Sequence, residues 1–226
     1  MSEQVVEKDV MLQAQSIWKK IQRPVLIAVI AAVVVFGGLY AYNEFVKKPK
    51  EEKAADALAK VQEAFGKDSS NIVINGDGLS KGALYIIKTY DGTKAANLAH
   101  FYAGISYLKL KNFPEAIKHL KDFSTDAKQV QMVAYTSLGH AYAESGKKEE
   151  AVDYYKKAGS IFPKDEFNSA ENLFLAASLL ETMSKNKEAL EIYKEIKAKY
   201  PNTDKGYQVD KNIYHLSVEK NDFSVN

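Results

Sequence analysis

Residues 132–165 read MVAYTSLGHAYAESGKKEEAVDYYKKAGSIFPKD, and this stretch predicts two helices that pack closely against each other. Gly139 in the first helix and Ala151 in the second are small, so the two helix backbones can approach closely. The polar residues 145–148 form a short turn that can reverse the chain. Pro163 ends the second helix, because proline cannot continue a helix and disfavours it in the preceding residue.

The same pattern occurs three times, so the chain contains an internal repeat. The steps from Gly104 to Gly139 and from Ala116 to Ala151 are both 35 residues, and the step from Ala151 to Ala189 is 38 residues. Periods near 34 residues with small residues at these offsets are typical of stacked helical hairpins. The matching positions in the three copies are Gly104, Tyr107, Ala116 and Leu120; Gly139, Tyr142, Ala151 and Tyr155; Ala177, Leu180, Ala189 and Tyr193.

These residues resemble the tetratricopeptide repeat, whose consensus has Leu-Gly-x-x-Tyr on the first helix, Ala and an aromatic residue on the second, and a closing Pro. The middle copy matches best. The first copy has Lys128 where the closing Pro would stand, and the third has Ala177 and Leu180 in place of Gly and Tyr. The consensus Trp is absent, and its three positions hold His100, Tyr135 and Leu173. The resemblance implies an all-α fold, with three repeats over residues 97–204 forming a solenoid of helical hairpins.

Weaker helical patterns flank the repeats. We expect residues 47–96 to form a linker and a degenerate first hairpin, with helices over Glu51–Phe65 and Leu79–Tyr90. Residues 205–226 are expected to form a capping helix, Lys205–Lys220, followed by a tail. This helix is expected to direct one set of residues inward, Tyr207, Ile213, Tyr214 and Leu216, and to keep another in water, Asp210, Lys211, Glu219 and Lys220.

An uncharged apolar stretch of nineteen residues, Pro24–Tyr42, lies near the N-terminus. As a helix it reaches about 29 Å, which is close to the thickness of the hydrocarbon core of a bilayer. It predicts a transmembrane helix over residues 24–46 after a short cytoplasmic tail, residues 1–23. A cleavable signal peptide is the alternative, but the apolar run is longer than usual for one and no Ala-x-Ala-like cleavage site follows it.

Local charge does not decide the orientation of this helix, because lysine residues lie on both sides of it. Lys19, Lys20 and Arg23 precede the helix, and Lys47, Lys48, Lys50 and Lys53 follow it. Long domains cross membranes largely regardless of their charge, whereas a short basic tail is retained in the cytoplasm. We therefore expect the N-terminus inside and the C-terminal domain outside.

The composition argues against several functional classes. Cysteine is absent, so no residue can accept the lipid of a bacterial lipoprotein, form a disulfide or bind a metal through a thiolate. Arg23 is the only arginine, so bidentate phosphate and base contacts are unavailable to the soluble domain and nucleic-acid binding is disfavoured. The histidines lack metal-ligand spacing, and residues 75–78 lack the sequence that continues a phosphate loop or an EF-hand, so a flexible turn is expected there.

We accordingly expect a protein that is not an enzyme, with no catalytic residue, no cofactor, no metal and no small-molecule substrate. No convergent polar cluster is visible in the sequence. An enzyme with an unrecognised active site is the alternative class.

The repeat resemblance implies a concave surface lined mainly by the first helix of each hairpin. A mixed apolar and polar groove of this kind suits a segment of another protein. We expect the partner-binding groove at Phe101, Ile105, Lys109, Thr136, His140, Glu144, Phe174 and Ser178, with further lining positions at Leu98, Val133, Glu171 and Glu181. Packing of the apolar members into the core is the alternative. The Lys and Asn residues with which some related domains bind a C-terminal carboxylate are absent from the matching positions, so that mode is not expected.

One span, no cysteine and a C-terminal repeat domain together resemble the single-pass proteins related to the bacterial ancillary translocon subunit. The segment Tyr90–Ala99, which enters the first full repeat, adds to this resemblance. It implies an inner-membrane protein with a periplasmic domain that assists exported proteins at or near the secretion translocon. Its partners would be translocon, exported or envelope proteins. A scaffold for cell-envelope assembly or division complexes is the alternative.

Overall fold

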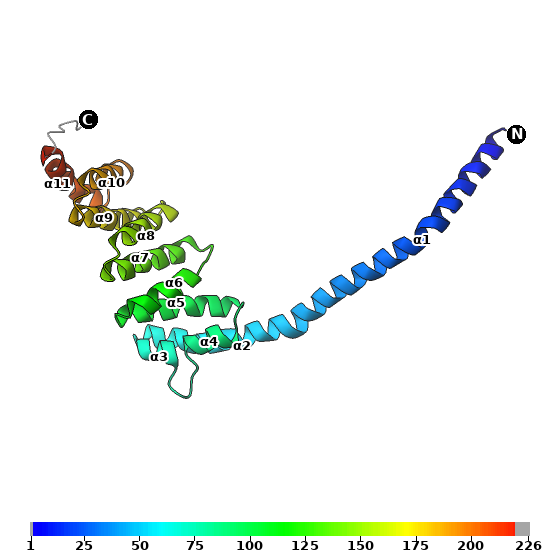
Figure 1. Ribbon diagram of the computed structural model, residues 1–226, viewed down its shortest axis with the longest axis horizontal. Helices are drawn as coiled ribbons and strands as arrows, with labels where there is room; N and C mark the ends of the chain where they lie inside the picture. The colour runs from blue at the N-terminus through cyan, green and yellow to red at the C-terminus, as the bar shows by residue number, and fades with distance from the viewer. Residues whose placement is uncertain (1, 220–226) are drawn as a thin grey trace. The chain divides into compact units, whose positions relative to one another are not determined.

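The computed structural model describes residues 2–219, and these residues are almost entirely helical (Figure 1). Within this range there is no β-strand, only an isolated bridge between Gly76 and Lys81. The elements are α1 (Ser2–Tyr42), the π-helix η1 (Asn43–Lys47), α2 (Lys48–Gly66), α3 (Ser70–Asn75), α4 (Ala83–Thr89), α5 (Lys94–Lys109), α6 (Phe113–Asp122), α7 (Lys128–Glu144), α8 (Lys148–Ile161), α9 (Glu166–Thr182), α10 (Asn186–Lys199) and α11 (Asp204–Glu219). The all-α prediction is confirmed. The chain divides into two compact units, with the division after Glu52.

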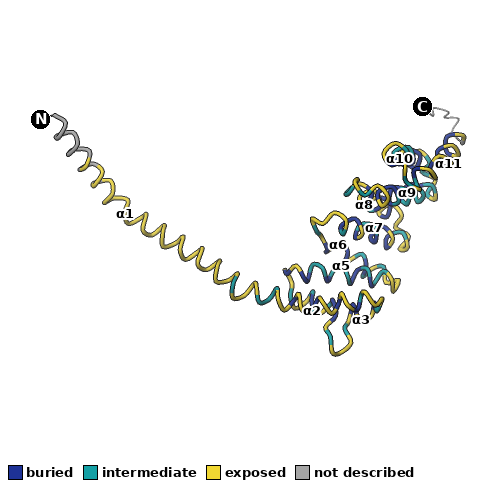
Figure 2. The backbone as a smooth tube through the Cα atoms, turned by 180° about the vertical axis from the view of Figure 1, so that it is seen from behind, coloured by how far each residue is buried: buried dark blue, intermediate teal, exposed yellow. Residues whose placement is uncertain are grey.

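The first unit is dominated by α1, which includes the expected tail from Ser2 onward and contains Pro24 within the helix. All described side chains from Ile17 to Asn43 are exposed (Figure 2), and several are large and apolar, such as Phe36 at 71% exposure. This is one helix that is long and apolar enough, by length and composition, to cross a membrane. None of the described residues buries this apolar surface.

The second unit contains three helical hairpins at the positions of the three sequence repeats, α5 with α6, α7 with α8, and α9 with α10. Each helix from α5 to α11 packs against the next one in the chain (Figure 1). The turns within the hairpins are short, residues 110–112, 145–147 and 183–185, and consist mainly of polar residues. One large apolar cluster runs through the last two hairpins and α11, and a second one joins α2, α3 and α4 to α5.

Small residues bring the two helices of each hairpin together, as the repeat pattern predicts. A methyl group added at Gly104 would lie 2.5 Å from Cγ of Leu120, and one added at Gly139 would lie 2.5 Å from Cδ1 of Tyr155. In the second helices, the matching alanines are fully buried: Ala116, Ala151 and Ala189. These positions have no room for a larger side chain.

In the hairpin before the repeats, two short helices follow α2 in place of one second helix. The expected single helix over residues 79–90 is shorter, α4, and an additional helix, α3, precedes it. A tight turn separates the two: Gly76 and Gly78 have φ angles of 82° and 87°, which favour glycine. Asp77 Oδ1 accepts hydrogen bonds from the backbone N–H groups of Leu79 and Ser80, at 3.0 and 2.6 Å. This loop is a turn between helices, as the sequence predicts.

Of the four residues of α11 that were expected to point inward, two do so and two do not. Ile213 and Leu216 are buried, but Tyr207 and Tyr214 are 64% and 70% exposed. The two tyrosines are seven residues apart and so share a face, which the helix turns outward. The physical reason is Gly206, because a Cβ there would collide with the carbonyl of Tyr200. The face of α11 that contains Gly206 therefore packs closely against Tyr200, and the buried Val209 also points inward.

Asp210 and Lys211 on α11 are exposed, as expected. Asp210 also forms an ion pair with Lys197 of α10, at 2.6 Å. Lys220, the C-terminal tail and the side chain of Glu219 lie outside the described residues.

Candidate functional site

A hollow of about 640 Å³ lies between α7 and α9, the first helices of two neighbouring hairpins. We call it the α7–α9 groove. Its α7 wall consists of Gln129, Met132, Val133, Thr136, Ser137 and His140, and its α9 wall consists of Asp165, Asn168, Glu171, Asn172 and Leu175. The two walls combine apolar side chains with hydroxyl, amide, imidazole and carboxylate groups. Two residues expected from the sequence, Thr136 and His140, therefore line one hollow.

Hydrogen bonds fix the α9 wall of the groove. Asp165 is the N-cap of α9, and its Oδ1 accepts the backbone N–H of Asn168 at 3.2 Å. One turn further on, the Asn172 amide Nδ2 donates to the carbonyl of Asn168 at 2.8 Å. This leaves Asn172 Oδ1 to accept a 2.6 Å hydrogen bond from the Thr136 hydroxyl of α7. The bond ties the two walls together and orients both side chains.

His140 is held from behind by Tyr155 of α8, whose hydroxyl lies 2.8 Å from His140 Nδ1. Burial raises the pKa of Tyr155 to about 12, so its hydroxyl stays protonated near neutral pH. Burial also lowers the pKa of His140 below its usual value, against a smaller opposite effect of Glu144. The His140 ring is therefore neutral near neutral pH, and its tautomer decides whether Nδ1 donates to or accepts from the Tyr155 hydroxyl.

The same device recurs in the next hairpin, 38 residues on. Ser178 occupies the place of His140, and its hydroxyl lies 3.2 Å from the hydroxyl of Tyr193, the counterpart of Tyr155. Tyr193 is fully buried. In the first hairpin the two positions hold Ile105 and Leu120, so an apolar contact replaces the hydrogen bond. At this pair of positions, the second and third hairpins thus have a polar contact between their two helices, and the first hairpin has an apolar one.

The remaining expected site residues lie apart from the α7–α9 groove. Phe101 and Ile105 are half-buried against the core, and the Phe101 ring lies 5.0 Å from that of Phe123. Phe174 is also half-buried, with its ring 5.6 Å from that of Tyr193. Glu144 is exposed at the end of α7.

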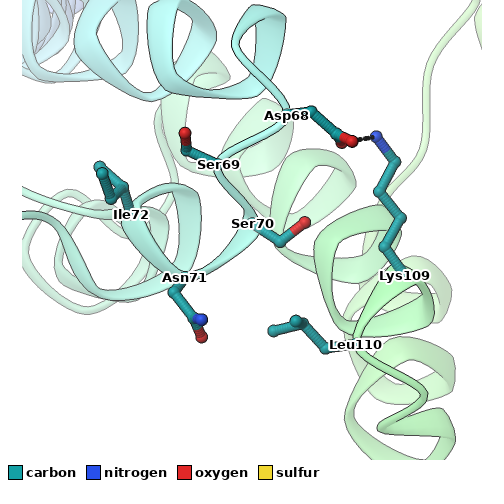
Figure 3. A pocket seen from close by; sticks show the side chains of 7 residues that line it. All are labelled: Asp68, Ser69, Ser70, Asn71, Ile72, Lys109 and Leu110. Atoms are coloured by element: carbon teal, nitrogen blue, oxygen red, sulfur yellow. Dashed lines mark hydrogen bonds and ion pairs between the residues drawn. The ribbon is translucent and has the colours of Figure 1, made fainter.

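Lys109 lies in a different hollow, shown in Figure 3, between the end of α5 and the turn that joins α2 to α3. Its Nζ pairs with Asp68 Oδ1 at 2.5 Å and lies 5.0 Å from the centre of the Phe65 ring. Ser69, Ser70, Asn71, Ile72 and Leu110 complete the lining. Both partners of the ion pair are exposed, so this hollow is a shallow surface feature.

Sequence reasoning found four residues of the groove, Val133, Thr136, His140 and Glu171, and missed most of the α9 wall. Asp165, Asn168 and Asn172 belong to the first turns of α9, ahead of or between the expected lining positions. The position of Asp165 could have been predicted, because an Asp just before a helical pattern indicates an N-cap. No comparable signal exists for Leu175, whose place in the groove depends on how far α7 and α9 diverge.

Chemically, the groove is suited to binding. Within the described residues, no group of three or more His, Cys, Asp or Glu side chains could hold a metal ion. Three of its polar side chains are engaged in hydrogen bonds, Thr136 with Asn172, Asn172 with Asn168, and His140 with Tyr155.

Acid is expected to destabilise the fold through three histidines. Burial lowers the pKa values of His100, His119 and His140 below their usual value. The unfolded chain therefore binds protons first as the pH falls below about 6.5, and the free energy of unfolding decreases until the folded-state pKa values are passed. Urea unfolding of the full chain in detergent, followed by circular dichroism, should show a lower midpoint at pH 5.5 than at pH 7.5. A His140→Leu variant should reduce this pH dependence, and an unchanged one would contradict the assignment.

Comparison with known families gives one result. The family model described as a tetratricopeptide repeat-like domain matches residues 15–207. A search of curated proteins finds no match to the chain. The matched range includes the apolar part of α1 as well as all three hairpins.

Proposed function

The chain belongs to the tetratricopeptide repeat-like domain family, and from this premise we propose that it is a membrane-anchored protein-interaction module that binds segments of other polypeptides in the α7–α9 groove. The observation that carries the proposal is the hollow between the first helices of two neighbouring hairpins, with its mixed lining. Such a surface offers apolar contacts for side chains and hydrogen-bonding groups for a peptide backbone.

The hairpins form a solenoid in this proposal. Contacts between helices that are not successive in the chain support it, since α3 packs against α5, α5 against α7, and α9 against α11. Contacts between successive first helices are what a regular stack of hairpins requires. The first helices then share one face, and α11 covers the end of the last apolar cluster.

The exposed apolar surface of α1 supports the proposed membrane anchor. A run of large apolar side chains without protein cover is stable in lipid and costly in water. The family match begins at residue 15, so the apolar stretch lies within the matched range. The basic residues before it favour a cytoplasmic N-terminus and an external repeat domain.

The partners we propose are exported proteins at or near the translocon of a bacterial inner membrane. The support is the combination of one apolar span with a C-terminal repeat domain, which the sequence shares with the ancillary translocon subunits. A scaffold for cell-envelope assembly or division complexes uses the same architecture and is the second candidate. In either role the chain acts by binding, without a cofactor and without a reaction of its own.

The test is purification of the full chain from membranes in mild detergent, followed by identification of the polypeptides bound to it. Val133 is 47% exposed on the groove wall, so Val133→Arg places a charged side chain in the path of a ligand. We expect this variant to retain about a tenth of the bound polypeptide, the loss typical of one central contact. Val218→Arg is the matched control, because Val218 is similarly exposed on α11 outside the groove.

Translocon subunits or exported proteins among the bound polypeptides would support the role at the translocon. Division or outer-membrane assembly proteins would support the scaffold role. Equal recovery with Val133→Arg, Val218→Arg and the unchanged chain would contradict binding in the groove.

A further inference from the structure

The charged side chains that line the α7–α9 groove are acidic. Asp165 and Glu171 both belong to the α9 wall, and none of the described residues that line the groove is Lys or Arg. His140 adds no charge near neutral pH, since burial lowers its pKa. The lining therefore favours a positively charged group and disfavours a carboxylate.

Both carboxylates keep unused hydrogen-bonding capacity. Asp165 accepts two bonds, from the backbone N–H and the side-chain Nδ2 of Asn168, at 3.2 and 2.8 Å. A carboxylate offers about four acceptor positions, so about two are left over. The side chain of Glu171 is 38% exposed, and it pairs with Lys205, whose Nζ lies 3.5 Å from Oε2.

Lys205 shows how a cation fits at this wall. It extends from the first turn of α11, and its Nζ lies 4.2 Å from the centre of the Phe174 ring while it pairs with Glu171. The side chain is only 21% exposed, so its methylene groups pack on protein surface while the ammonium group meets a carboxylate and an aromatic face. The 3.5 Å separation is long for a charge-assisted hydrogen bond, so a better-placed cation can compete for Glu171.

Apolar and polar groups beside the carboxylates suit the rest of a peptide. Met132, Val133 and Leu175 offer surface to apolar side chains or to the stem of a lysine. The Nε2 atom of His140 remains for a hydrogen bond to a peptide group, because the other ring nitrogen is engaged by Tyr155.

We propose that the groove recognises a polypeptide segment in which a lysine or arginine stands between apolar residues. The cationic side chain binds Glu171 in competition with Lys205, and Asp165 adds negative charge to the same wall. Its apolar neighbours lie on Met132, Val133 and Leu175. This inference rests on the proposed function, because it specifies the chemistry of the segment that the groove binds.

The test measures binding of three short fluorescent peptides to the full chain in detergent at low salt. The peptides are capped at both ends and differ only at a central residue between leucines and valines, which is lysine, glutamine or glutamate. We expect the lysine peptide to bind about tenfold more tightly than the glutamine peptide, as for one close charge pair, and the glutamate peptide to bind most weakly.

Charge-neutral variants identify the residues responsible. Combining Asp165→Asn with Glu171→Gln should abolish the preference for lysine, and Asn is as good an N-cap as Asp, so α9 keeps its cap. Glu166→Gln is the matched control, because Glu166 is exposed at the start of the same helix and does not line the groove. Lys205→Met should tighten binding of the lysine peptide several-fold, since it removes the internal competitor.

The outcomes separate this inference from the proposed function. If all three peptides bind equally and Val133→Arg abolishes their binding, the groove binds polypeptides and the inference about charge is overturned. A lysine preference that survives the double neutral variant would also overturn it, because the cation would then bind elsewhere. If no peptide shows binding that Val133→Arg weakens, both the inference and the groove as a binding site fail.

Discussion

Deletion of residues 24–46 is expected to move the protein from the membrane fraction to the soluble fraction. The segment contains ten large aliphatic or phenylalanine residues before Tyr40, namely Val25, Leu26, Ile27, Val29, Ile30, Val33, Val34, Val35, Phe36 and Leu39. At roughly 0.3 to 0.6 kcal/mol each, they favour insertion by about 3 to 6 kcal/mol. Ultracentrifugation of membranes washed with alkaline carbonate measures the distribution.

Point variants of the full-length chain test whether the loss of apolar character, rather than the deletion itself, releases the protein from the membrane. Replacing both Ile30 and Val34 by Arg places two charges near the centre of the span, at a cost of about 2.5 to 3.5 kcal/mol each, and should cancel insertion. Replacing Val34 by Ile is the control and should leave the protein in membranes. N-terminal sequencing of the membrane-bound form should still read from the start of the chain. A shortened, freely soluble wild-type protein would show that the stretch is a cleaved signal peptide.

Gly139→Leu is expected to lower the free energy of unfolding by about 3 kcal/mol, the upper part of the range for overpacked cores. A Cβ at this position lies 2.5 Å from both Cδ1 and Cε1 of Tyr155, which is 4% exposed. The tyrosine ring cannot turn aside without losing its hydrogen bond to His140. Leucine must therefore push α7 away from α8. Thermal unfolding followed by circular dichroism should show a midpoint about 6 to 12 °C lower.

Gly66→Leu is the matched control for this substitution. Gly66 also lies in a helix, at the end of α2, but nothing lies within 4 Å of an added Cβ. Leucine is a better helix former than glycine, so this variant should be neutral or slightly stabilising. Similar midpoints for the two variants would show that α7 and α8 do not approach each other as closely as the repeat pattern requires.

The hairpins could be predicted from the sequence because close helix packing demands small residues at fixed intervals. Gly104 and Gly139 face bulky side chains of the partner helix, and Ala151 has no exposed surface. These contacts are local, between helices joined by a short turn, so the spacing along the chain records them directly.

The parts that were not predicted depend on contacts that spacing does not record. The rotation of α11 follows from the collision that a side chain at Gly206 would make with Tyr200, and it leaves Tyr207 and Tyr214 outside. The break between α3 and α4 follows from two glycines with positive φ angles, which the sequence marks as a turn without fixing the helix after it. The α9 wall of the groove depends on the separation of two helices from different hairpins.

Photo-crosslinking from the groove in intact membranes tests the central claim most directly. A photoreactive amino acid at Val133, which is exposed on the groove wall, is compared with one at Asp153, which is exposed on α8 and does not line the groove. The account predicts that position 133 labels other polypeptides and position 153 does not. Labelling of other chains from position 153 alone, or only internal crosslinks from position 133, would contradict it.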